Sequence, residues 1–93
     1  MMATTYEPRP SASVEAMMLD GTAAGNETVR VWVRSLLGED SVAVPNAMSY
    51  STVVMQQNGT TLIARGDQYV YWDGTTMHVA DKLAFEMYYM PAA

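Results

Sequence analysis

Residues 52–80 read TVVMQQNGTTLIARGDQYVYWDGTTMHVA and decide the fold, because two turn signals interrupt short runs of strand-forming residues. Asn58-Gly59 and Asp73-Gly74 each lie between two such runs. Asparagine, aspartate and glycine tolerate the positive φ angles that a two-residue type I′ turn requires. The pattern therefore predicts two antiparallel hairpins. Their expected strands are residues 52–57, 60–65, 68–72 and 75–80.

The segment before these hairpins, residues 26–38, carries two competing patterns. Valines alternate with other side chains, which favours a strand, but apolar residues also recur at i, i+3, i+4, i+7 and i+8 from Val29. Asn26 suits a helix N-cap, and Gly38 suits the position just after a helix. We therefore predict a helix of about three turns. The residues expected on its solvent-exposed side are Arg30, Arg34 and Val31.

The remaining segments complete the expected architecture. Residues 13–19, 41–44 and 84–90 are typical of further strands, whereas residues 1–11 have two prolines, little periodicity and the character of a flexible lead-in. A chain of 93 residues allows one domain. We predict that residues 12–93 form a single α+β domain, with one helix packed on a curved, mainly antiparallel sheet of about five to seven strands.

Composition excludes several classes of protein. Hydrophobic residues make up 49% of the chain, which is too many for a disordered protein, and the absence of cysteine excludes disulfides. A net charge of −5 disfavours nucleic acid and anionic membranes as partners. The apolar runs are far shorter than the roughly 20 residues of a membrane-spanning helix. With no signal-peptide pattern, we expect neither secretion nor membrane insertion.

Two of the predicted strands are apolar or aromatic on both faces. In residues 68–72, Tyr69 and Tyr71 point one way while Val70 and Trp72 point the other, and residues 84–90 repeat this arrangement. A single helix can cover only one face of a sheet. The second face must be covered by curling of the sheet into a partial barrel, by a second copy of the chain, or by a partner.

Short motifs distributed from about Pro10 onward resemble a group of small proteins encoded by bacteriophages, especially phages of actinobacteria. The matching motifs are Val14-Glu15-Ala16, Val31-Trp32-Val33, Gly66-Asp67 before Tyr69-Val70, and Phe85-Glu86-Met87-Tyr88-Tyr89. The chain departs from the group in having Arg65 where proline is usual, and in lacking the basic, proline-containing approach to the final strand. The resemblance implies a phage product in the host bacterial cytoplasm that acts on the host or its defences.

Catalytic and metal-binding patterns are missing from the sequence. His78 is the only histidine, and its nearest acidic neighbours along the chain are Asp73 and Asp81. With no cysteine and scattered carboxylates, there is no recognisable metal spacing. No serine lies in a nucleophile motif, and no glycine-rich loop has the residues of a phosphate-binding loop. We expect no catalytic residue, metal or cofactor, and we expect His78 on the surface of a strand.

Methionine and tyrosine are the abundant interface-forming residues of this chain, with nine methionines and six tyrosines. We place a partner-binding surface on residues 68–72 and 84–90. The six residues expected to contact a partner are Tyr69, Tyr71, Trp72, Met87, Tyr88 and Tyr89.

The expected function is that of a non-enzymatic phage protein that binds and modulates a host bacterial protein. Its effect would be cytotoxic, or part of defence or superinfection, and we expect a homo-oligomer such as a dimer. One alternative is a protein that binds a small nucleotide signal of host defence, with Arg30, Arg34 or Arg65 meeting phosphates. Another alternative is a minor component of the virion.

Overall fold

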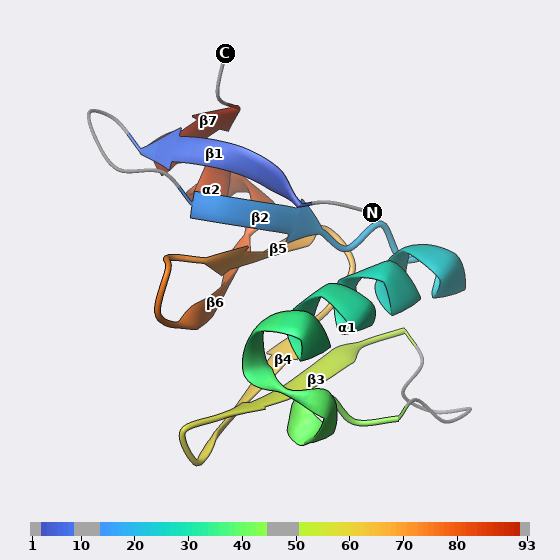
Figure 1. The fold of residues 1–93 in the computed structure, drawn as a ribbon. Helices are drawn as coiled ribbons and strands as arrows, with labels where there is room; N and C mark the ends of the chain where they lie inside the picture. Colours follow the sequence, from blue (N-terminus) through green and yellow to red (C-terminus); the bar gives the residue numbers. More distant parts are fainter. Residues whose placement is uncertain (1–2, 9–13, 45–50, 92–93) are drawn as a thin grey trace.

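The computed structural model describes residues 3–8, 14–44 and 51–91 and shows an α+β protein, as predicted (Figure 1). Its strands form two antiparallel sheets. The main sheet contains, in spatial order, β6 (Met77–Asp81), β5 (Gln68–Trp72), β2 (Val14–Met18), β1 (Thr4–Pro8) and β7 (Tyr89–Pro91). The second sheet is a hairpin of β3 (Val53–Gln57) and β4 (Thr60–Ala64).

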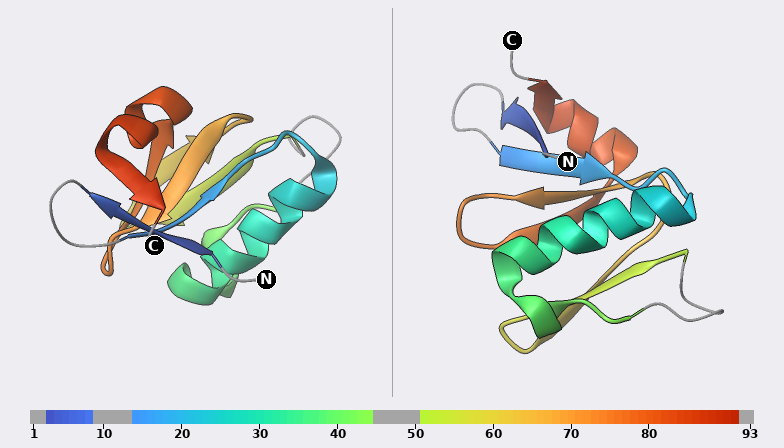
Figure 2. Two further views of the ribbon diagram at one scale, coloured as in Figure 1. Left: turned by 90° about the horizontal axis from the view of Figure 1, so that it is seen from above. Right: turned by 45° about the vertical axis from the view of Figure 1, so that its right-hand side comes forward.

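Helices lie on opposite faces of the main sheet (Figure 2). Helix α1 (Ala23–Leu37) and the β3–β4 hairpin cover one face, and the short helix α2 (Lys82–Tyr88) covers the other. Strand β5 supplies side chains to both sides: Val70 belongs to the core under α1, whereas Tyr69 belongs to the core under α2. Both apolar faces of β5 are therefore covered by the chain itself, with a second helix that the sequence analysis did not predict.

The core under α1 is the larger one and is mainly aliphatic. Its fully buried members come from α1, from the hairpin and from the main sheet, so these three units share one interior. The residues with the lowest exposure are Leu19, Val33, Val53, Met55, Ala64 and Val70. This packing fixes the positions of α1 and the hairpin relative to the main sheet.

The expected single curved sheet of about five to seven strands is only partly observed. The strands are divided between two sheets, and the main sheet reaches five strands only by including the three-residue β7, with no clear curvature. The division follows from the turn before β5. Asp67 adopts a φ of 67° and donates its N–H to the carbonyl of Leu19 at 2.8 Å. This contact directs β5 into pairing with β2 instead of β4.

The hairpin at Asn58-Gly59 is confirmed. Gln57 pairs with Thr60 across a two-residue turn in which Asn58 and Gly59 have φ angles of 50° and 78°. The side chain of Gln57 also attaches the hairpin to β6. Its Nε2 donates to the Met77 carbonyl at 3.0 Å, and its Oε1 accepts the Met77 N–H at 2.6 Å. One amide side chain therefore occupies the outer edge of β6 where a neighbouring strand would bond.

The predicted two-residue turn at Asp73-Gly74 is wrong. Trp72 pairs with Met77, so residues 73–76 form a longer loop and the strand begins at Met77 instead of residue 75. The Asp73 carboxylate explains the difference, because its Oδ1 accepts the backbone N–H groups of Thr75 and Thr76 at 2.8 and 2.7 Å. Aspartate readily makes such local bonds to the backbone of the following residues.

Helix α1 is confirmed, but it begins before the predicted N-cap. Thr22 is the N-cap, and its hydroxyl accepts the N–H of Gly25 at 2.9 Å. Asn26 lies inside the helix and is buried, so its predicted capping role is wrong. The helix ends at Leu37, and Gly38 follows it as the C-cap, as predicted, with a φ of 112° that favours glycine.

The predicted exposure of α1 side chains is right for Val31 and wrong for Arg30. Val31 is exposed, whereas Arg30 is only 2% exposed. The Arg30 guanidinium donates to the Thr52 carbonyl at 2.7 Å and lies 3.4 Å from Glu27 Oε1. This tertiary bond to the segment before β3 turns Arg30 inward, and Arg34 stays partly exposed at 3.6 Å from the same carboxylate.

Three other predicted segments differ from the structure. Residues 84–90 are not a strand, because the chain turns back across the sheet as α2 before it forms β7. The predicted lead-in contains β1, which pairs with both β2 and β7; residues 1–2 and 9–11 lie outside the described residues. In place of a strand at 41–44, Ser41 ends a 3₁₀ turn (η1, Glu39–Ser41) and Val42 makes one bridge to Met55.

Candidate functional site

The core under α2 is small and built mostly from aromatic rings. Phe85 stacks between Tyr69 and Tyr89, with ring centroids at 4.1 and 4.7 Å. Tyr71 lies 5.2 Å from Phe85 and 5.5 Å from Tyr89, and its other neighbour is His78, stacked at 4.9 Å. These rings attach α2 and β7 to the sheet. Three of the tyrosines predicted to contact a partner therefore hold the fold together.

Polar groups reinforce this attachment. The hydroxyl of Tyr69 donates to Oε2 of Glu86 at 2.8 Å, which links β5 to the middle of α2. Burial raises the pKa of Tyr71, and the nearby Tyr89 and Asp73 add to the effect. A tyrosine with its ordinary pKa of 10.0 is already neutral at physiological pH, and burial in the packed cluster favours this neutral form further.

The outer side of α2 has large apolar side chains in contact with solvent. Leu83, Met87 and Tyr88 are 78%, 69% and 65% exposed, and Ala84 is exposed as well. Phe85 is the buried residue of this seven-residue helix, all of whose side chains the structure describes. Leu83 and Met87 are four residues apart and therefore lie on one face. We call Leu83, Ala84, Met87 and Tyr88 the α2 surface.

The six residues predicted to contact a partner are thus divided by the structure. Met87 and Tyr88 are exposed on the α2 surface, whereas Tyr69 is buried and Trp72 packs against the larger core. Tyr71 and Tyr89 are partly buried against the aromatic cluster. Leu83 was missed by the sequence analysis, which placed it in a connection between strands. A helical spacing of four residues between Leu83 and Met87 was the available signal.

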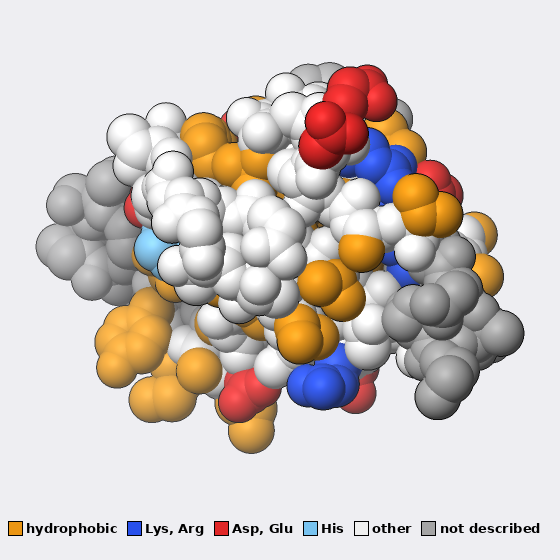
Figure 3. Space-filling view, turned by 90° about the horizontal axis from the view of Figure 1, so that it is seen from below, with side chains coloured by type: hydrophobic (Ala, Val, Ile, Leu, Met, Phe, Trp, Pro, Cys, Tyr) orange, Lys and Arg blue, Asp and Glu red, His pale blue; other side chains and the backbone are white. Residues whose placement is uncertain are grey.

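Apolar surface is distributed unevenly over the molecule. In the view from below, polar surface separates the hydrophobic side chains, and the largest hydrophobic group lies at the lower left edge (Figure 3). Among the described residues outside α2, the large hydrophobic side chains counted as exposed are Met18, Val31, Val44 and Ile63. These belong to four different segments of the chain, whereas α2 presents three such side chains within six residues.

His78 and Asp73 form a polar cluster at the loop between β5 and β6. Nε2 of His78 lies 2.8 Å from Oδ2 of Asp73 and 2.9 Å from the Thr76 hydroxyl. The bond from His78 and the backbone N–H groups of Thr76 and Thr75 hold the pKa of Asp73 well below its usual range. Since every partner comes from this loop or the strand after it, the cluster braces the loop. His78 is 41% exposed at its side chain.

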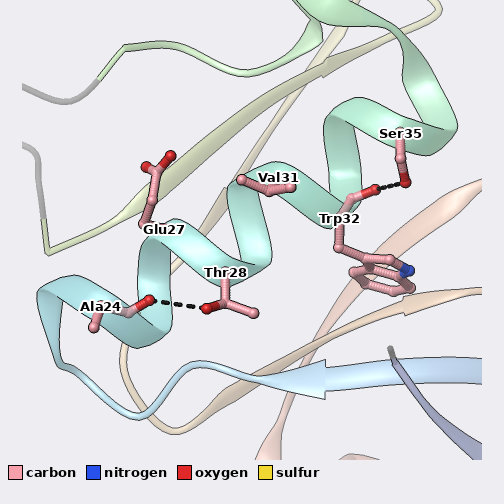
Figure 4. Close-up of a pocket in the computed structure, with 6 residues that line it drawn as sticks. All are labelled: Ala24, Glu27, Thr28, Val31, Trp32 and Ser35. Atoms are coloured by element: carbon pink, nitrogen blue, oxygen red, sulfur yellow. Dashed lines mark hydrogen bonds between the residues drawn. The ribbon is translucent and has the colours of Figure 1, made fainter. Parts of the chain in front are cut away.

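A shallow depression lies on the outer side of α1 and has a volume of about 540 Å³ (Figure 4). Most of its polar groups already have partners, since the hydroxyls of Thr28 and Ser35 bond to helix carbonyls and Glu27 pairs with two arginines. The described residues that line it are Ala24, Glu27, Thr28, Val31, Trp32 and Ser35. Few groups remain to orient a polar ligand.

Comparison of the chain with family models, curated proteins and solved structures finds no match. Among residues 3–8, 14–44 and 51–91, no set of three or more histidine and carboxylate side chains is arranged to hold a metal ion. Neither helix within these residues has the length and apolar character needed to cross a membrane. The α2 surface is therefore the strongest candidate site on geometric grounds.

Proposed function

We propose that this chain is a non-enzymatic binding protein that docks helix α2 into an apolar groove of a partner protein. The observation that carries the proposal is the exposure of Leu83, Met87 and Tyr88 on one short helix. Large apolar side chains gathered on a surface are typical of sites where proteins associate. Spacing of four residues along a helix face is the pattern by which helices fit grooves.

The inner side of α2 supports this proposal because it makes the helix a preformed ligand. Phe85 is 1% exposed within the aromatic cluster, and Glu86 accepts the Tyr69 hydroxyl. A helix that is already ordered loses less conformational entropy on binding than a disordered peptide does. Leu83, Met87 and Tyr88 would then act as anchors in the groove.

The net charge of this chain indicates which residues surround the groove of the partner. The chain has a net charge of −5, so a partner with basic residues at the rim would associate faster than an acidic one. The resemblance to small phage proteins implies that the partner is a host bacterial protein, which we include in the proposal. Growth inhibition of the host would be one consequence of such binding.

The nucleotide-binding alternative receives less support. It relied on arginines to meet phosphates, but Arg30 is buried and bonded to Thr52, and both Arg30 and Arg34 lie beside Glu27. Only Arg65, of the three arginines considered, is fully exposed. One exposed arginine out of the three considered, on a chain with net negative charge, favours neither strong nor specific phosphate binding.

The test compares the wild type with a Leu83→Ser, Met87→Ser double variant. A partner is captured from a bacterial lysate, purified, and its dissociation constant is measured with each protein. Loss of two apolar anchors is expected to weaken binding by roughly 100-fold. Ile63→Ser is the matched control, because Ile63 is 44% exposed but lies on β4 in the other sheet.

Equal binding by the wild type and the double variant would show that the α2 surface is not the docking site. Equal loss in the Ile63→Ser control would show that the effect is nonspecific. The melting temperature of all three proteins must be similar for either comparison, and exposed positions are chosen for that reason.

A further inference from the structure

The methionine side chains of this fold differ widely in the fraction of their surface that is exposed to solvent. Met55, Met77 and Met17 are buried, at 0%, 1% and 8% exposure, and Met18 is 38% exposed. Met87 is 69% exposed, the highest value among the methionine side chains that the structure describes. Oxidation of a thioether depends on access of the oxidant to sulfur. Among the methionine side chains that the structure describes, Met87 on the α2 surface is therefore the most accessible, Met18 is less so, and Met17, Met55 and Met77 are protected in the core.

We propose that Met87 is an oxidation site whose modification by hydrogen peroxide stops docking through α2; this inference rests on the proposed function. The sulfur of Met87 attacks one peroxide oxygen, so that an S–O bond forms and the O–O bond breaks. The thioether is oxidised by two electrons to the sulfoxide, and the peroxide is reduced to water. No other oxidant or cofactor is needed for this step, and methionine sulfoxide reductases, with a separate two-electron reductant, return the sulfoxide to the thioether.

The position of Met87 explains why this small change would matter for binding. Met87 shares a helix face with Leu83 and adjoins Tyr88, so a sulfoxide oxygen would lie in the middle of an apolar contact. Removing that polar group from water without a hydrogen-bond partner opposes association. The fold itself would be unaffected, because Phe85 and the Tyr69–Glu86 bond, not Met87, attach α2 to the sheet.

The experiment treats the intact protein with hydrogen peroxide and follows each methionine by peptide mass spectrometry. Met87 sulfoxide is expected to form before Met18 sulfoxide and long before oxidation of Met17, Met55 or Met77. At that stage the melting temperature should be unchanged. Affinity for the partner purified in the preceding capture experiment should fall about tenfold or more.

Matched variants separate the possible causes. Met87→Leu keeps a similar apolar volume but has no thioether at this position, so its own affinity, whatever its value before treatment, is expected to be the same after peroxide. Met18→Leu is expected to lose affinity on oxidation, as the wild type does. Oxidation of Met87 no faster than that of the buried methionines, or full affinity with Met87 oxidised, would overturn the inference. Failure of the untreated protein to bind any partner would overturn the proposed function as well.

Discussion

The two faces of the main sheet are covered in different ways. On one side, the 15-residue helix α1 and a hairpin enclose an aliphatic core with several side chains at zero exposure. On the other side, a seven-residue helix contributes one buried side chain to a small cluster of rings. A helix that buries one residue must leave the others outside. Because those others include leucine, methionine and tyrosine, α2 exposes more large apolar side chains than any other described helix or strand.

The largest expected effect tests the α1 side with two valines of the same helix. Val33→Asp places a charge where exposure is 0% and should prevent folding, since the cost of several kcal/mol approaches the whole stability of a small domain. Val31→Asp places the same charge at 56% exposure and should change stability by less than about 1 kcal/mol. Circular dichroism and urea unfolding measure both. A folded Val33→Asp protein would contradict the description of a closed core.

The α2 side should respond locally. Phe85→Ala removes the ring that stacks on Tyr69 and Tyr89 and is expected to cost about 3 kcal/mol. Because little else attaches α2, hydrogen exchange should increase most in residues 82–91 and least in α1. Tyr88→Ala, on the outer side of the same helix, is the control and should leave exchange unchanged. A uniform increase over both helices would mean that the two sides unfold as one unit.

The smallest expected effect concerns the loop that adjoins the aromatic cluster. The pKa of Asp73 is lowered from its ordinary value of 3.8, which means that the ionised carboxylate stabilises the fold. This stabilisation is fully present when the pH is well above 3.8, and it decreases as the pH falls below that value. Asp73→Asn should therefore make the loss of unfolding free energy between about pH 5 and pH 2 less steep. The difference should stay below about 1 kcal/mol because the carboxylate is near solvent. Identical slopes for both proteins would refute the stabilising role of Asp73.

Local signals predicted the parts of the fold that depend on neighbouring residues. Asn58-Gly59 specified its hairpin because the turn needs positive φ at both positions, and Gly38 marked the end of α1 for a related reason. Residues 68–72 form β5 with the predicted bounds. The apolar character of both faces of this strand predicted that each face needs a cover, but the observed cover of the second face is α2, which is none of the three covers considered.

The failures at the Asp73-Gly74 turn and at the N-cap of α1 were local, whereas the others depended on residues distant in sequence. Arg30 was expected in solvent, but its guanidinium bonds to a carbonyl 22 positions later. Alternation in residues 84–90 favoured a strand, yet the segment forms a helix whose single buried ring stacks on β5. The prediction of the α2 surface was incomplete for the same reason. Met87 and Tyr88, which were selected as partner contacts, lie on the exposed side of α2, but Leu83 becomes their neighbour only once the segment is helical.

The amide of Gln57 has a consequence for how this molecule meets others. This amide forms hydrogen bonds with both the N–H and the carbonyl of Met77. It therefore occupies backbone hydrogen-bonding positions on β6, an edge strand of the main sheet. A second molecule would have to displace this side chain before it could extend the sheet there, and exposed strand borders are common starting points for aggregation. The same two hydrogen bonds also connect the β3–β4 hairpin to the main sheet. A single side chain therefore both covers part of the sheet edge and holds the two sheets together.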